Sequence, residues 1–204
     1  YYGNSYYSDG ANGRYANVSY NETTQITLSG WIRPLQMPPG SDQYLFSYLD
    51  SGGNARSRLY LKSGTCNLYY VSKRSADGVW KANYNLQSNQ WTHFAMTYDN
   101  SSTENAPRFY FNGIEASVTQ ISAPGGSVAT GITFRIGNQT TGNSWKGKID
   151  ELRLYNRTFD PKDIPLLLLT QAVNSAPNVF AGNGFDGIAS ETYYLNASVS
   201  DDGN

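Results

Sequence analysis

The sequence predicts an all-β sandwich, and three observations support this fold class. Apolar and polar residues alternate with a period of two through most of the 204-residue chain. Clusters of Gly, Asn, Asp and Pro separate the alternating runs, as turns separate short strands. Charged residues make up only 15% of the chain, so most of its polarity comes from uncharged hydrogen-bonding groups. With 39% hydrophobic residues, a chain of this length can fill a core of its own.

The stretch TQITLSGWIRP, residues 24–34, is the first clear strand. Successive side chains of a strand point to opposite faces, so Ile26, Leu28 and Ile32 are predicted to face the core. Trp31 is predicted to face away from it. Two further runs alternate in the same way, and they are residues 58–62 and 93–98.

An Asn-Gly pair at residues 112 and 113 follows an apolar strand and predicts a hairpin, because both turn positions need positive φ. Residues 114–118 are the expected returning strand. Two later strands are predicted at 133–137 and 148–155. A short helix or turn follows, beginning at either Pro161 or Asp163.

The balance of charges and the rare residue types exclude several classes of partner and site. The formal net charge is −1, which offers no basic field for a nucleic acid. A single cysteine and a single histidine exclude a disulfide framework and a Cys/His zinc site. The longest apolar run is residues 166–169, far too short to span a membrane.

The composition changes after residue 172, where a Pro-containing linker precedes a strand-like stretch, TYYLNASVS. We therefore predict one domain over residues 1–172. Residues 173–204 are predicted to be a linker and the truncated start of a second β domain, because they are too few to bury a core. The chain begins with Tyr and is expected to be a segment of a longer precursor, covalently linked to neighbouring β domains.

Two adjacent carboxylates, Asp150 and Glu151, lie in the predicted strand 148–155. Strict alternation places Asp150 on the face of Leu152, and Glu151 on the face of Arg153. Carboxylates on opposite faces do not converge on one substrate atom, which argues against an acid/base pair. Arg153 is the expected ion-pair partner of Glu151.

Asp150 has two interpretations. The charge of a carboxylate among leucines must be stabilised, either by hydrogen bonds from backbone N–H groups or by a hard cation such as calcium. In the upstream loop SDGANG, Asp9 and Asn12 are further candidate ligands, although Asp-Gly and Asn-Gly also form ordinary turns. A structural calcium ion held by Asp9, Asn12 and Asp150 is therefore one of the two hypotheses.

Several phrases taken together resemble the concanavalin A-like jelly roll in its laminin G-like form. In family order they are YYSDGANGRYANV, QITLSGWIRP, LFSYLD, QWTHFAMTYDNSS, FYFNGIEA, FRIGNQ and GKIDELRLYNRTFD. They extend from Tyr6 to about Leu169. The tail from Pro177 is similar to the start of Ig-like repeats of the polycystic-kidney-disease type.

The resemblance implies two antiparallel sheets in a jelly-roll sandwich and an extracellular location, either secreted or on the cell surface. It also implies a calcium ion at the rim, with the family's ligands falling on Asp150 and on the Asp9 to Asn12 loop. The strand and acidic loop that usually precede the Asp-Gly phrase are either absent or cut off before Tyr1, and one family ligand is expected to be lost with them. The fold does not name a ligand, because members bind sugars, bind proteins or space other domains.

Aromatic residues on the wetter faces are the candidates for ligand binding, since aromatic rings stack on the apolar faces of sugars. Strand phase places four rings on the non-core side, and two tryptophans are predicted in loops. The candidate set is Trp31, Arg58, Tyr60, Tyr69, Trp80, Tyr110 and Trp145. The alternative is that these rings pack under loops or form cross-strand pairs.

These features predict a non-catalytic, extracellular carbohydrate-binding module of a larger protein. The stretch IDEL lacks the leading Glu of the jelly-roll glycosidases, so catalysis is not expected. The alternative is a protein-adhesion or spacer module without glycan binding. The expected partner is accordingly a polysaccharide or glycan, or another surface protein.

Overall fold

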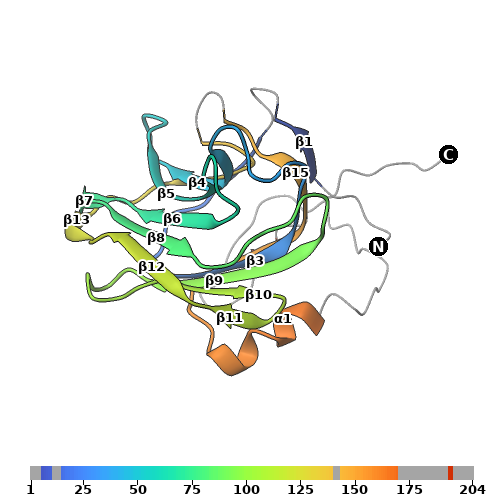
Figure 1. Cartoon of the computed structure of the whole chain (residues 1–204). Coiled ribbons are helices and arrows are strands. Elements are labelled where there is room, and N and C mark those ends of the chain that lie inside the picture. The colour runs from blue at the N-terminus through green and yellow to red at the C-terminus, as the bar shows by residue number, and fades with distance from the viewer. Residues whose placement is uncertain (1–5, 11–14, 140–142, 170–192, 195–204) are drawn as a thin grey trace.

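The computed structural model describes residues 6–10, 15–139, 143–169 and 193–194. Within them, two seven-stranded antiparallel sheets pack face to face, with a two-stranded ribbon at one side (Figure 1). This arrangement confirms the predicted sandwich.

Sheet A contains the strand with Asp150 and Glu151, which is β15, and the strands on either side of it. In spatial order they are β1 (Tyr6–Asp9), β15 (Lys146–Tyr155), β3 (Gln25–Pro34), β9 (Thr92–Asp99), β10 (Arg108–Phe111) and β11 (Ile114–Ala116), and β16 (Tyr193–Tyr194) also pairs with β15.

Sheet B holds most of the remaining strands. In order they are β12 (Val118–Ser122), β8 (Gly78–Ala82), β6 (Leu68–Ser72), β5 (Ala55–Leu61), β4 (Gln43–Leu49), β14 (Thr133–Ile136) and β2 (Ala16–Ser19). The ribbon pairs β7 (Arg74–Ala76) with β13 (Gly125–Val128).

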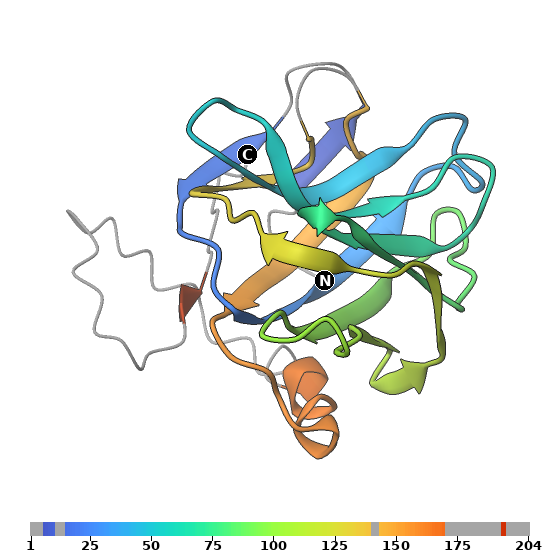
Figure 2. The same cartoon turned by 90° about the vertical axis from the view of Figure 1, so that its left-hand side faces the viewer.

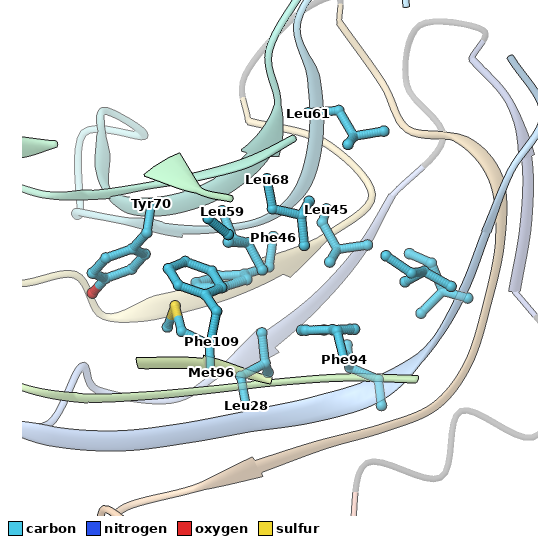
Figure 3. Packing of buried hydrophobic residues seen from close by; sticks show 14 of the residues in the cluster. Leu28, Leu45, Phe46, Leu59, Leu61, Leu68, Tyr70, Phe94, Met96 and Phe109 are labelled. Carbon is cyan, nitrogen blue, oxygen red and sulfur yellow. The ribbon is translucent and has the colours of Figure 1, made fainter. Parts of the chain in front are cut away.

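The core lies between the two sheets and is formed by the side chains that alternate inward from each strand (Figure 3). Leu28 and Met96 come from sheet A, and Phe46 and Leu59 come from sheet B; each is fully buried. The alternation in residues 24–34, 58–62 and 93–98 thus predicted the core-facing side chains correctly.

The Asn-Gly hairpin is confirmed. Asn112 and Gly113 have φ values of 50° and 82°, and the turn joins β10 to β11. The returning strand is shorter than predicted, because the chain leaves sheet A after Ala116. From Val118 it pairs with β8 in sheet B instead.

The predicted C-terminal helix is a 3-10 turn, η1 (Pro161–Asp163), followed by one turn of α-helix, α1 (Leu166–Leu169). This segment lies against the outer face of sheet A (Figures 1 and 2). Ile164 and Leu167 pack there with Ala95, Tyr110 and Tyr155 in a second buried cluster. Neither helical segment of the described chain is long and apolar enough to cross a membrane.

The predicted second domain, residues 173–204, falls outside the described residues except for β16. This pair of residues hydrogen-bonds to the end of β15, with Tyr194 opposite Arg153. The domain boundary at residue 172 stays a prediction.

A buried carboxyl group lies between β2 and β3. The Glu22 side chain accepts a hydrogen bond from the Gly131 N–H at 2.9 Å. Burial raises the pKa of Glu22 from the usual 4.5 to about 7, against the opposing effects of Ser57, the Gly131 N–H and Arg56. The charged carboxylate is therefore disfavoured in the folded protein.

Replacing Glu22 by Gln should change how stability depends on pH. The folded protein holds the Glu22 proton up to about pH 7, whereas the unfolded chain releases it near its usual pKa of about 4.5. The wild-type protein therefore loses stability as pH rises through this window. The measurement is denaturant unfolding at pH 4.5 and at pH 8. The free energy of unfolding of Glu22→Gln, relative to that of the wild type, should rise by up to about 3 kcal/mol from the lower to the higher pH.

The exposed Glu104 gives a matched control. The difference between Glu104→Gln and wild type should be the same at both pH values. If the difference in unfolding free energy between Glu22→Gln and wild type were also the same at both pH values, the pKa of the Glu22 carboxyl would not be raised.

Candidate functional site

The outer face of sheet B carries a row of tyrosines. Residues paired directly across an antiparallel sheet share a face, and here Tyr44 pairs with Tyr60, and Tyr60 with Tyr69. Lys81 of β8 pairs with Tyr69 and ends the row. The alternate residue Leu59 faces the core, so these four side chains, which we call the tyrosine row, point away from it.

The three rings of the tyrosine row are in contact. The centroids of Tyr44 and Tyr60 are 5.2 Å apart with planes 28° from parallel. Those of Tyr60 and Tyr69 are 5.7 Å apart at 36°. Tyr60 is only 8% exposed and forms the floor, whereas Tyr44 and Tyr69 on either side are half-buried. Together they form a continuous aromatic surface across three strands.

A second row of polar side chains runs beside the first and shares strands β4 and β5 with it. Arg58 lies two residues from Tyr60 on β5 and pairs with Ser47 of β4. Ser47 in turn pairs with Arg135 of β14, which pairs with Asn17 of β2. We call Asn17, Arg135, Ser47 and Arg58 the arginine row. Two guanidinium groups therefore lie on the same face as the tyrosines.

Both guanidinium groups are held by neutral groups. Arg135 donates from Nε to the Asn17 side-chain oxygen at 2.9 Å, and its Cζ lies 3.9 Å from the centre of the Tyr15 ring. Arg58 donates to the backbone oxygen of Arg56 at 3.4 Å. Among the described residues, neither arginine forms an ion pair with a carboxylate.

The hydroxyl groups of Tyr44 and Tyr60 stay protonated at any physiological pH. Burial raises the pKa of Tyr60 to about 12, with Asp42 and Tyr44 adding to the effect and Arg58 opposing it. Burial likewise raises the pKa of Tyr44. The row therefore offers neutral O–H groups, each able to donate and accept a hydrogen bond.

The structure brings three of the seven predicted ligand-binding residues together here, namely Arg58, Tyr60 and Tyr69. Alternation in residues 58–62 located the first two. Sequence analysis missed Tyr44, Lys81 and Arg135, which complete the surface. The signal for Lys81 and Arg135 was available, since each alternates with buried residues on its own strand.

Three predicted residues are not at the surface. Trp80 belongs to strand β8 rather than to a loop, and its side chain is 1% exposed in the core. Trp145 precedes β15 as expected, but its ring is fully buried. Tyr110 does face outward from sheet A, where the helical segment covers it and leaves it 2% exposed. None of the three is accessible to a glycan.

Trp31 lies on the outer face of sheet A, on the opposite side of the core from the tyrosine row. Its half-buried ring meets His93 edge-on at 5.4 Å. His93 is fully buried, and burial together with the charge of Arg153 lowers its pKa to about 4. Trp31 therefore takes no part in the surface on sheet B.

The predicted faces of Asp150 and Leu152 are wrong because β15 contains a β-bulge. Its register against β3 shifts between Asp150 and Arg153, and Glu151 has a φ of 51°. Asp150 consequently faces outward while Leu152 turns into the core. The predicted ion pair of Glu151 with Arg153 is present, at 3.0 Å.

The predicted calcium ligands do not converge. Asp9 pairs with Lys146, four residues before Asp150 on β15, so their Cα atoms are separated by roughly 13 Å along the strand. Calcium–oxygen bonds of about 2.3–2.6 Å cannot connect both carboxylates to one ion. Asp150 accepts a hydrogen bond from the Glu151 N–H at 2.9 Å.

Asn12 lies outside the described residues. Within the described ranges, no group of three or more His, Cys, Asp and Glu side chains could hold a metal ion. The residues present therefore do not fit a calcium ion shared by Asp9 and Asp150.

Known structures share this architecture. A heptameric SAP-like pentraxin from Limulus polyphemus aligns with a TM-score of 0.59 at 15% identity, over 76% of this chain and 75% of that chain. Domain 4 of an extracellular arabinanase from Geobacillus stearothermophilus, solved with arabinotriose, gives 0.51 at 24% identity over 81% of each chain. These identities show a common fold and no more.

The receptor-binding domain of botulinum neurotoxin type G aligns with a TM-score of 0.55 at 10% identity. The match covers 79% of this chain but only 45% of the toxin domain, so the chain spans less than half of that structure. No curated protein matches the sequence in a direct comparison. A laminin G family model, described as the concanavalin A-like lectin/glucanases superfamily, matches residues 8–165. Since this match covers most of the chain and both sheets, the protein belongs to the concanavalin A-like lectin/glucanase superfamily.

Proposed function

We propose that this chain is a non-catalytic carbohydrate-binding module that binds a glycan on the outer face of sheet B. The observation that carries the proposal is the continuous tyrosine row. Half-buried, rigid rings of this kind stack on the apolar faces of sugars, while neutral hydroxyls and guanidinium groups beside them bond to sugar hydroxyls. The family description and the arabinotriose complex of a structural neighbour support the proposal.

A binding role is favoured over hydrolysis by the residues on this face. Glycoside hydrolysis needs two carboxyl groups about 5–10 Å apart across the sugar. The tyrosine and arginine rows contain neither Asp nor Glu. We further propose that the module works outside the cell, as lectin-like relatives of this fold do.

Calcium has no part in the proposed binding. Asp150 and Asp9 belong to sheet A, and the core separates them from the outer face of sheet B. Retention on a polysaccharide column should therefore be the same with added calcium and with chelator. Loss of retention under chelation, with the protein still folded, would place a metal at the binding surface.

Replacing Tyr69 or Tyr44 by Ala should weaken glycan binding about fivefold, because each change removes a stacking contact worth roughly 1 kcal/mol. The measurement is affinity electrophoresis against a panel of soluble polysaccharides, followed by calorimetry on those that retard the wild type. Tyr7→Ala is the matched control, since Tyr7 is a 52% exposed tyrosine on sheet A. Equal losses for Tyr7→Ala and Tyr69→Ala would remove sheet B as the site.

A protein-binding role is the second candidate. Ile114, Ile121 and Val128 are 75%, 55% and 37% exposed, on the strands β11, β12 and β13 that follow one another in the chain. An adhesion role would use such exposed apolar side chains as protein contacts. If a folded protein is retained by no polysaccharide of a broad panel, this adhesion role replaces the glycan proposal.

A further inference from the structure

We propose that the glycan bound on sheet B is an acidic polysaccharide, one whose sugar units carry carboxylate or sulfate groups. This inference rests on the proposed function and specifies its ligand. It is drawn from the charges on the outer face of sheet B and from their positions relative to the tyrosine row.

The outer face carries three cations in fixed register. Lys81 ends the tyrosine row, and Arg58 and Arg135 belong to the arginine row. Lys81 is half-buried and, within the described part of the chain, forms no ion pair. Three positive charges on one face are therefore left without a carboxylate partner there.

Acidic residues are absent from the same register positions. Neither row contains an Asp or a Glu. The outward positions beside the rows on β6, β8 and β12 contain none either, since they are Val71, Val79 and Thr119. The chain as a whole has 15 basic and 16 acidic residues, so this local excess does not reflect the overall composition. The two rows are therefore basic on a protein of nearly neutral charge.

The carboxylate of Asp42, two residues before Tyr44, is already engaged. Asp42, beside Tyr44, accepts a hydrogen bond from the Ser63 N–H at 2.8 Å and from Lys62 Nζ at 3.3 Å. It does not neutralise either arginine. An anionic ligand would supply the counter-charges that this face lacks.

The two rows suit a linear ligand lying across the strands. Neighbouring strands are about 4.8 Å apart, so Arg58 and Arg135, two strands apart, are separated by roughly 10 Å along the arginine row. On β5, the strand that carries both Arg58 and Tyr60, the two rows are about 6.6 Å apart along the strand. Sugar rings stacked on the tyrosines would therefore present their acidic substituents sideways to the arginines.

Arginine is the side chain suited to this task. Its planar guanidinium can donate two parallel hydrogen bonds to a carboxylate or a sulfate. Arg135 is held in place by Asn17 and Tyr15, both uncharged. This preorganisation lowers the conformational cost of binding without using up the charge.

The test compares matched polysaccharides that differ only in charge. The probes are polygalacturonate with its carboxyl-reduced neutral form, and dextran sulfate with dextran, titrated into the 204-residue chain at low salt. Binding of the acidic member at least tenfold more tightly than its neutral form is expected, with affinity falling as salt rises. The pair showing the preference identifies carboxylate or sulfate as the recognised group.

Variants locate the recognition. Arg58→Gln and Arg135→Gln should each weaken binding of the acidic polysaccharide about tenfold, and Lys148→Gln, which removes a cation from sheet A, should leave it unchanged. Equal binding of neutral and acidic forms, with Arg58→Gln without effect, would overturn the inference while the proposed function stood. Equal losses for Lys148→Gln and Arg58→Gln would also overturn it.

Two further outcomes separate the inference from its alternatives. Single-stranded DNA bound as tightly as the acidic polysaccharide, with the same loss in Arg58→Gln, would show a general polyanion surface and overturn the assignment to polysaccharide. No binding of any polysaccharide by the folded chain would overturn the proposed function itself.

Discussion

Replacing Trp80 by Ala should lower the free energy of unfolding by about 3–5 kcal/mol, the usual loss for a fully buried large aromatic residue. The Trp80 ring lies between the sheets, 5.4 Å from the centre of the Tyr98 ring and 6.2 Å from that of Tyr70. Removing it leaves a cavity that the rigid strands around it cannot close. Denaturant titration followed by circular dichroism measures the loss.

Tyr69 provides the contrast, because it pairs with β8 one residue beyond Trp80 but points outward. Tyr69→Ala should change stability by less than about 1 kcal/mol while weakening glycan binding. Trp80→Phe, which keeps part of the packing, should show an intermediate loss and leave glycan affinity intact. A Trp80→Phe protein of normal stability with weakened glycan affinity would instead place Trp80 at the surface.

Replacing Gly147 by Ala should lower the free energy of unfolding by about 3 kcal/mol or more, through overpacking and backbone strain. Gly147 has a φ of 153°, and an added Cβ would lie 2.3 Å from the backbone oxygen of Arg33. The clash is with backbone, so the pairing of β15 with β3 would have to shift. Thermal and denaturant unfolding measure the effect.

Gly40 is the matched control. A Cβ added at Gly40 meets no atom within 4 Å, so Gly40→Ala should change stability by less than about 1 kcal/mol. Similar stabilities for the two variants would mean that the strand pairing at Gly147 relaxes freely.

Alternation predicted the sandwich because a strand with one dry and one wet face must repeat with period two. The prediction is most accurate where pairing is regular, as in β3, where Ile26, Leu28 and Ile32 all face the core. The same regularity in β5 allowed Arg58 and Tyr60 to be assigned to the outer face from the order of the residues alone.

Alternation does not give the correct face of a side chain where a strand contains a β-bulge. An extra residue on one strand reverses the faces of all residues that follow. In β4 the register shifts between Tyr44 and Phe46, so that Tyr44 points outward although Phe46 and Tyr48 point inward. The shift at Asp150 in β15 had the same effect. A bulge depends on the partner strand, which a single sequence does not specify.

Tertiary packing accounts for the other misplaced residues. Trp80 was predicted to lie in a loop, two residues after Gly78. Instead, Gly78 is in strand β8, and a Cβ there would lie 2.3 Å from the Trp80 ring. The glycine makes room for the indole. Tyr110 was placed on the correct face, but only the structure shows that the helical segment covers it.

The position of that helical segment also determines how the module would be displayed. Ile164 and Leu167 pack against the outer face of sheet A. This face is on the opposite side of the module from the tyrosine row. The last described residue of α1, Leu169, therefore lies on the side of the module away from the tyrosine row. Contacts made through α1 would thus approach the module from sheet A, and the tyrosine row on the other sheet would stay free for a long polymer.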